Sequence, residues 1–137
     1  MVHTVTAWLP VLVVDDEPPL LHSVSLLLRS AGIAHVLTLE DSRAVLPLLE
    51  EQEVGVLLLD LSMPHLSGQE LLKRVAADYP DVPVIVTTAT NDLETAVHCI
   101  QAGAIDYLVK PVENNRLVSS VRRALELRSL RDLETGA

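Results

Sequence analysis

The chain has 137 residues, of which 49% are hydrophobic, and this is enough for one domain with a buried core. Its formal net charge of −9 argues against a nucleic-acid-binding surface, because binding to phosphate backbones requires clustered lysine and arginine residues. The single cysteine, Cys99, excludes an internal disulfide, and the lack of a membrane-length apolar run or a signal peptide predicts a cytoplasmic protein without membrane contact.

Short apolar runs alternate along the chain with longer segments of helical periodicity. We predict strands at residues 11–14, 33–39, 54–59, 82–88 and 105–109. We predict helices at residues 18–31, 42–52, 66–78, 92–102 and 112–134. This alternation is typical of an α/β fold with a parallel sheet. The first, third and fourth strands are almost continuously apolar and are expected at the centre, whereas His35 and Thr38 interrupt the second and place it at an edge.

Pro47 lies about one turn inside the second predicted helix, residues 42–52. A proline at this position has no N–H to donate to the Arg43 carbonyl. We therefore expect this helix to be short or kinked.

The last predicted helix has a charged continuation in which leucines recur three or four residues apart. The spacing is compatible with a coiled-coil seam and, equally, with a frayed helix end. We divide the chain into an N-terminal tail at residues 1–10, one domain at 11–125, and an extension of the last helix at 126–137.

Polar residues follow four of the five predicted strands. Asp15, Asp16 and Glu17 follow the first strand, and Asp60, Thr88 and Lys110 end the third, fourth and fifth. Because the carboxyl ends of parallel strands meet at one edge of a sheet, we expect these side chains to lie together. An isolated acidic run is more often a solvated loop, but its place after a buried strand favours a cation site. Mg²⁺ is expected rather than Ca²⁺, because few protein oxygens are offered.

Asp60 directly follows an apolar run, so its carboxylate is expected at the same edge as the cation. Such a carboxylate can attack phosphorus and form an acyl phosphate. The Lys110 ammonium could neutralise one phosphoryl oxygen, and the Thr88 hydroxyl could donate to another. Each of these two residues is ordinary by itself, and only the combination indicates phosphoryl chemistry. His22, His35, His65 and His98 lie on different predicted elements and are not expected to form a metal pair.

Four segments together resemble the response-regulator receiver domain, namely VLVVDDEPP (11–19), LLLDLSMPHLSG (57–68), VPVIVTTAT (82–90) and GAIDYLVKP (103–111). The resemblance covers residues 11–125 and implies a CheY-like, flavodoxin-like fold with strand order 2-1-3-4-5 and helices on both faces. It also implies that Asp60 accepts a phosphoryl group from a sensor histidine kinase. Mg²⁺ would be held directly by Asp16, Asp60 and the Ser62 backbone carbonyl, and through water by Asp15.

The resemblance further implies a conformational switch. Thr88 and Tyr107 would be coupled, so that phosphorylation alters the face formed by the fourth helix, the fifth strand and the fifth helix. Ser62 and Thr90 flank the site and would tune the access of water. The Lys110–Pro111 peptide bond would be cis, which a bond before proline permits at modest cost.

The stretch at residues 91–134 most resembles receivers of NtrC-type transcriptional activators. This resemblance implies a homodimer on phosphorylation and a last helix that leads into an output domain controlling transcription. The sequence contains no output domain, so it is either a piece of a longer regulator or a stand-alone one. Any DNA binding would belong to the missing part.

Two other functions use related features. A phosphohydrolase of haloacid-dehalogenase type also forms an aspartyl phosphate, but it needs a second aspartate two residues after the nucleophile, where this chain has Ser62. A degenerate receiver would act as an interaction module without phosphorylation, although all the functional positions are intact. We therefore expect a switch rather than an enzyme, one that promotes only its own phosphorylation and slow dephosphorylation.

Overall fold

The computed structural model describes residues 9–63 and 67–134. In chain order the elements are β1 (Val11–Val14), α2 (Pro18–Ser30), β2 (Val36–Leu39), the 3₁₀ helix η1 (Ser42–Ala44), α3 (Val45–Glu51), β3 (Val56–Asp60), α4 (Gly68–Asp78), β4 (Val84–Thr88), α5 (Leu93–Gln101), β5 (Asp106–Val109) and α6 (Asn114–Glu134). All five predicted strands and all five predicted helices are present. Residues 1–8 of the predicted tail, and residues 64–66 with His65 and the first position of the predicted third helix, lie outside the described residues.

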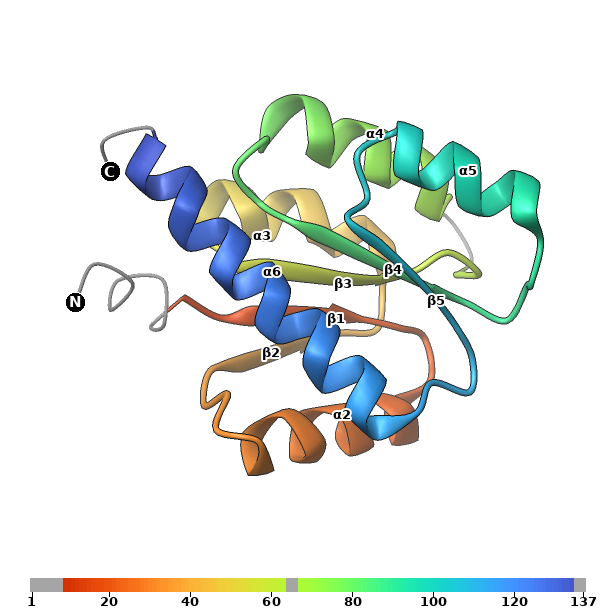
Figure 1. Cartoon of the computed structure of the whole chain (residues 1–137), viewed down its shortest axis with the longest axis horizontal. Helices are drawn as coiled ribbons and strands as arrows, with labels where there is room; N and C mark the ends of the chain where they lie inside the picture. The colour runs from red at the N-terminus through yellow and green to blue at the C-terminus, as the bar shows by residue number, and fades with distance from the viewer. Residues whose placement is uncertain (1–8, 64–66, 135–137) are drawn as a thin grey trace.

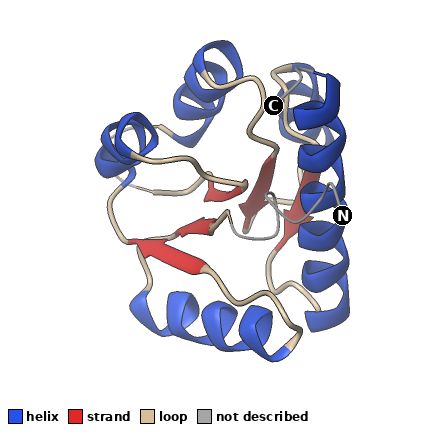
Figure 2. Ribbon diagram, turned by 90° about the vertical axis from the view of Figure 1, so that its left-hand side faces the viewer, coloured by secondary structure: helices blue, strands red, loops and turns tan. Residues whose placement is uncertain are grey.

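The strands form one parallel sheet in the order β2-β1-β3-β4-β5, which is the order that the resemblance implied. Helices cover both faces of this sheet (Figures 1 and 2). Residues of α3, α4 and α5 pack on one face, and residues of α2 and α6 pack on the other. In the described part of the chain, no helix is both long enough and apolar enough to cross a membrane.

The central strands contribute to two separate cores. Leu12 and Leu57 face the α3, α4 and α5 side, whereas their neighbours Val11 and Val56 face the α2 and α6 side, because side chains alternate along a strand. All four are 0% exposed. Fully burying one such side chain stabilises the fold by about 1.5–3 kcal/mol. The continuous apolar runs are therefore explained by helices on both faces, as predicted.

The second strand lies at an edge of the sheet, which confirms the expectation from His35 and Thr38. It begins at Val36, three residues later than predicted. The reason lies at the end of α2, where Gly32 has a φ of +91° and the Ile33 N–H donates to the Leu28 carbonyl at 2.9 Å. This is the Schellman arrangement, so Ile33 belongs to the helix end rather than to the strand.

Pro47 lies at the third position of α3. The N–H groups of the first helical turn have no partner within the helix, so a proline there removes no hydrogen bond. The segment before it forms the short 3₁₀ helix η1 instead, capped by Asp41, which accepts from the Arg43 N–H at 2.9 Å. The predicted shortness of this helix is confirmed, since α3 has seven residues.

Candidate functional site

Three carboxylates converge where β1 and β3 end. Asp15 follows β1 and Asp60 ends β3, and the pairing of Val14 with Leu59 places these two residues side by side. One carboxylate oxygen from each of Asp15, Asp16 and Asp60 lies within 4.8 Å of the others. Asp15 and Asp60 are only 3% and 2% exposed, whereas Asp16 is exposed. The structure thus brings together three of the residues predicted for the cation site.

Lys110 reaches the same place from the end of β5. Its Nζ donates to Asp15 Oδ2 at 2.7 Å and to Asp60 Oδ2 at 3.2 Å. The Lys110 backbone N–H donates to the Thr88 carbonyl at 2.7 Å, which fixes the base of the side chain against β4. The Lys110–Pro111 peptide bond is cis, as the resemblance implied.

The charges at this edge do not balance. Burial raises the pKa of Asp60, and the negative charge of Asp15 adds to this rise. The Ser62 N–H and Lys110 favour the ionised form and act in the opposite direction, but the pKa remains above its ordinary value. Burial alone would lower the pKa of Lys110, but the hydrogen bonds and charges of Asp15 and Asp60 outweigh it and raise that pKa. With all groups ionised, three carboxylates face one ammonium, which leaves two negative charges uncompensated.

The acidic corner fits a magnesium ion. Carboxylate oxygens are the ligands that Mg²⁺ prefers, and a few such ligands completed by water are typical of its protein sites. The three oxygens of Asp15, Asp16 and Asp60 are close enough to share one ion, and the exposure of Asp16 leaves room for water. A divalent cation would also neutralise the two uncompensated charges.

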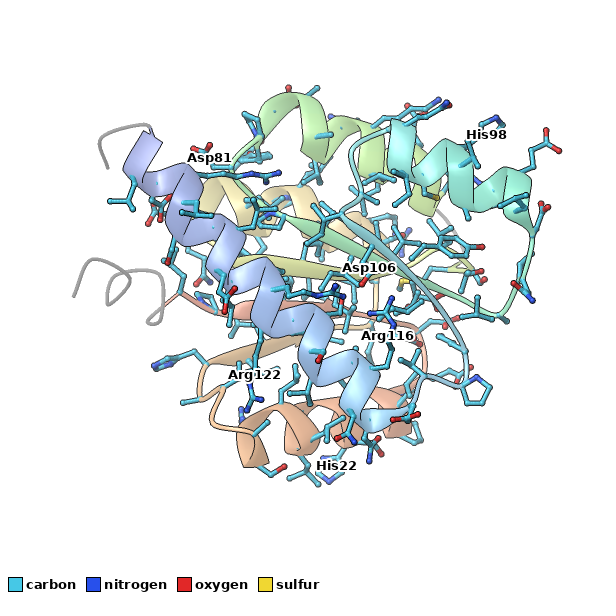
Figure 3. The ribbon with its side chains drawn as sticks, in the orientation of Figure 1. His22, Asp81, His98, Asp106, Arg116 and Arg122 are labelled. Atoms are coloured by element: carbon cyan, nitrogen blue, oxygen red, sulfur yellow. The ribbon has the colours of Figure 1, made fainter. Side chains whose placement is uncertain are left out.

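Figure 3 shows His22 on α2 and His98 on α5 at opposite sides of the molecule, so these two histidines form no pair.

Ser62 lies two residues after Asp60, and its backbone N–H donates to Asp60 Oδ1 at 3.0 Å. This bond holds one carboxylate oxygen while Lys110 binds the other. The turn leads towards α4, and Gly68 at the start of that helix lies against it, since a Cβ at Gly68 would meet Leu61 Cα at 2.6 Å. Glycine is therefore required there for α4 to approach the turn that holds Asp60.

A chain of hydrogen bonds connects Thr88 with Tyr107. Thr88 is 2% exposed, and its Oγ1 accepts from the Thr90 N–H at 3.1 Å. The Thr90 carbonyl in turn accepts from the Tyr107 hydroxyl at 2.8 Å. The Tyr107 ring is partly buried and packs against the core under α5. The two residues of the expected switch are thus connected through Thr90, which the sequence had suggested only as a position flanking the site.

A cavity that the sequence did not indicate lies beside the acidic corner. Its volume is about 400 Å³, and it lies between α2 and the start of α6, with Asp15 and Lys110 at its edge. Mostly apolar side chains line it, and Ser23 and Thr87 add hydroxyl groups. The place of Thr87 in this cavity could have been predicted, because side chains alternate along β4 and Thr87 therefore lies on the sheet face opposite Thr88.

Comparison with known proteins agrees with this geometry. A family model of the response regulator receiver domain matches residues 11–122. The chain is 39% identical over 120 residues to the C4-dicarboxylate transport transcriptional regulatory protein DctD of Pseudomonas aeruginosa. The aligned region covers 88% of this chain and 26% of that protein. The chain is 39% identical over 113 residues to the DNA-binding transcriptional regulator NtrC of Escherichia coli, covering 82% of this chain and 24% of that protein. It is 36% identical over 113 residues to the transcriptional regulatory protein FixJ of Bradyrhizobium diazoefficiens, covering 82% of this chain and 55% of that protein.

Solved structures show the same fold. A CheY-like response regulator receiver domain protein from Methanospirillum hungatei superposes with a TM-score of 0.83 at 27% identity, covering 90% of this chain and 98% of that one. NtrX from Brucella abortus superposes with a TM-score of 0.82 at 29% identity, covering 93% of this chain and 28% of that one. The chain therefore spans between about a quarter and about half of the length of the named regulators it matches. The matched family model, the shared fold and the acidic corner together show that this chain belongs to the response regulator receiver domain family.

Proposed function

We propose that this receiver is a phosphorylation-activated switch of a two-component system in which Asp60 accepts the phosphoryl group from a sensor histidine kinase. The observation that carries the proposal is the placement of one ammonium between two buried carboxylates. Lys110 Nζ lies 2.7 Å from Asp15 and 3.2 Å from Asp60, at the edge where Asp16 also lies. A structural ion pair needs one acidic group for one basic group. Three carboxylates around one ammonium instead suit a site that binds a further positive charge, such as Mg²⁺.

In the proposed reaction an Asp60 carboxylate oxygen attacks the phosphorus atom of a phosphohistidine. A new P–O bond forms while the P–N bond to the imidazole breaks, and the released imidazole takes up a proton from solvent. Lys110 lies beside the attacking carboxylate and stabilises the negative charge that gathers on the phosphoryl oxygens. Asp16, Asp60 and the Ser62 carbonyl would hold Mg²⁺ directly and Asp15 would hold it through water, and the bound ion would supply the remaining positive charge.

The Thr88 hydroxyl transmits the change in our proposal. A phosphoryl oxygen on Asp60 attracts this hydroxyl, so Thr88 Oγ1 turns away from the Thr90 N–H that it now accepts from. Thr90 then shifts, and with it the carbonyl that binds the Tyr107 hydroxyl. A nearly complete change of state needs about 5.5 kcal/mol, and two charge-assisted hydrogen bonds, at about 1.5–3 kcal/mol each, are of that size.

The surface altered by this movement consists of α5, β5 and α6. Helix α5 exposes Leu93, Val97 and Ile100, which are 80%, 43% and 49% exposed and lie three or four residues apart on one side of the helix. We propose that phosphorylation changes how this surface meets a second copy of the chain or an output domain, and that the outcome is control of transcription.

The phosphoryl group should persist long enough to signal. Rapid hydrolysis would need an acid or base beside the acyl phosphate, and the residue two positions after Asp60 is Ser62, which has no carboxylate. Ser62 and Thr90 are both exposed beside the site, where their side chains would set the access of water. This favours a switch over an enzyme that turns over substrate.

The proposal is tested by intact-mass spectrometry after incubation with acetyl phosphate and Mg²⁺. The wild-type chain should gain the mass of one phosphoryl group, and hydroxylamine should remove it. Asp60→Asn should gain none, whereas the control Asp78→Asn, which changes an exposed aspartate at the end of α4, should behave as wild type. An added phosphoryl group in Asp60→Asn, or sustained multiple turnover of a phosphomonoester, would contradict the proposal.

A further inference from the structure

Helix α6 continues beyond the part of the chain that packs apolar side chains on the sheet. Its buried apolar residues end at Ala124, and the matched family model ends at residue 122. Farther along, Leu130 and Leu133 are 58% and 52% exposed. A short helical segment is only marginally stable in water by itself. Among the apolar side chains of residues 126–134 only Leu127 is partly buried, so apolar burial contributes little to the contact of this segment with the domain.

Arg128 supplies a contact of another kind. Its side chain is only 7% exposed, although arginine is almost never fully buried without partners. Nη1 donates to the Val54 carbonyl at 2.6 Å, and Nε donates to Asp132 Oδ1 at 2.9 Å, one turn farther along α6. Val54 is 1% exposed and directly precedes Gly55 and the central strand β3. The helix is thus bonded to the backbone just before the central strand of the sheet.

A second contact lies one turn farther along α6. Arg131 Nη1 donates to the Pro80 carbonyl at 3.1 Å, in the connection between α4 and β4. Figure 3 shows Asp81, the next residue of this connection, near the C-terminal half of α6. Two hydrogen bonds to two different connections resist both lifting and rotation of the helix, which a single contact would not. The planar guanidinium also fixes the direction of each of its N–H groups.

We propose that Arg128 is a latch that holds residues 126–134 of α6 on the domain and fixes the direction in which the chain runs at residue 134. The latch acts through the amino end of β3, while Asp60 lies at the carboxyl end of the same strand. Its effect on direction does not depend on phosphorylation. Loss of the guanidinium leaves the buried Val54 carbonyl without this donor, and the helix beyond Ala124 without its main attachment.

The test measures the direction of the helix by distances between two spin labels. The labels are placed at two exposed positions, Leu133→Cys on α6 and Lys73→Cys on α4, in a Cys99→Ala background. The doubly labelled parent should give one narrow distance distribution. Arg128→Met places an unbranched apolar side chain in the buried position and removes the hydrogen bonds to Val54 and Asp132. The distance distribution should therefore become at least twice as wide. The control Arg74→Met, an exposed arginine of α4, should leave the width unchanged.

An equal width in the parent and in a folded Arg128→Met variant would overturn the proposal. If circular dichroism shows that Arg128→Met is unfolded, the same distance measurement is made on Asp132→Asn. This variant weakens one of the two contacts of Arg128 and leaves the buried guanidinium in place. A wider distribution in Asp132→Asn supports the latch, and an unchanged width overturns it. Neither measurement requires phosphorylation, so the result is independent of the proposed function.

Discussion

Lys110 binds two carboxylates at once, and in the proposed reaction the same ammonium would also stabilise the incoming phosphoryl group. The ammonium holds Asp15 and Asp60 in place before any phosphoryl group arrives, so little reorganisation is needed when one does. Asp60 is the group that gains most from this, because burial raises its pKa and only its ionised form can attack phosphorus. The reactivity proposed for Asp60 therefore depends on the compensation of charge around this one buried carboxylate.

We expect Lys110→Met to fold but to accept phosphoryl groups slowly. The change removes the only ammonium that contacts Asp60 among the described residues, and losing one group that stabilises transition-state charge costs about 10²- to 10³-fold in rate. The measurement is the rate of phosphorylation by acetyl phosphate at saturating Mg²⁺. Lys73→Met, at an exposed position on α4, is the matched control. A Lys110→Met rate within threefold of wild type would show that the ammonium has no part in the reaction.

Magnesium should stabilise the folded chain, because the ion compensates carboxylates that repel one another only in the folded state. A ligand at 100 times its dissociation constant stabilises by about 2.7 kcal/mol. We expect the thermal midpoint to rise with Mg²⁺ and to return on chelation. Asp16→Asn removes an exposed carboxylate from the acidic corner and should abolish most of the rise. An equal rise in wild type and Asp16→Asn would place the ion elsewhere.

The elements of this fold were largely predictable, because each has a local signal. The unbroken apolar runs predicted the central strands, and His35 and Thr38 correctly placed β2 at an edge. Pro47 indicated a short second helix, but not the 3₁₀ turn of η1 that replaces its beginning. The start of β2 was misplaced because Ile33 looks like a strand residue, while its N–H is used to close α2.

The sequence predicted that Asp15, Asp16, Asp60 and Lys110 lie together, but it did not predict the hydrogen bonds around them. The acidic residues follow buried strands of a parallel sheet, and that alone predicts a common edge. The connection from Thr88 through the Thr90 backbone to Tyr107 has no sequence signal, because backbone groups mediate it. The burial of Arg128 was equally unexpected, since an arginine in a charged helical tail is expected on the surface, and here its side chain is 7% exposed.

Strand β5 and helix α6 are held together by Asp106. Its carboxylate accepts from Arg116 at 2.9 Å, from Ser120 at 2.8 Å and from Arg123 at 3.1 Å. Figure 3 shows Asp106 and Arg116 facing each other. Burial alone would raise the pKa of Asp106, but the hydrogen bonds from Arg116 and Ser120 outweigh it, so that the pKa is lowered from its ordinary value of 3.8.

This lowered pKa predicts a dependence of stability on pH. A carboxylate with a depressed pKa in the folded state stabilises the fold above its ordinary value of 3.8, and this contribution is lost as the pH falls through the folded-state pKa. We expect Asp106→Asn to lower the free energy of unfolding by about 1 kcal/mol at pH 7, because the arginines are largely exposed. The difference from wild type should shrink below about pH 3.8. Urea denaturation at pH 7, 5 and 3 measures it, and a difference that is equal at all three values would contradict the account.

Across the whole molecule, the acidic corner and the α6 contacts of Arg128 and Arg131 lie at opposite edges of the sheet. Its carboxyl edge holds the acidic corner, and its amino edge holds the α6 contacts of Arg128 and Arg131. Between them, α5, β5 and α6 form the surface that Tyr107 adjoins (Figure 1). In the proposed switch, a change at Asp60 would reach this surface through Thr88 and Thr90, which are linked to Tyr107 by hydrogen bonds.

Thr88→Val should separate phosphorylation from its effect on this surface. Valine keeps the shape of threonine but offers no hydroxyl to the phosphoryl group or to the Thr90 N–H. We expect phosphorylation of Asp60 to continue, while amide hydrogen exchange in α5 no longer responds to it. The measurement compares exchange in peptides covering α5 with and without acetyl phosphate. A full response in phosphorylated Thr88→Val would remove the hydroxyl from the proposed mechanism.

The proposed switch depends above all on the formation of an acyl phosphate on Asp60. Borohydride reduces an aspartyl phosphate to homoserine, so peptide sequencing by mass spectrometry after phosphorylation and reduction locates the modified residue directly. We expect homoserine at position 60 and at no other position of the chain. Homoserine at position 15 or 16, or none anywhere under conditions in which the intact chain gains a phosphoryl group, would contradict it.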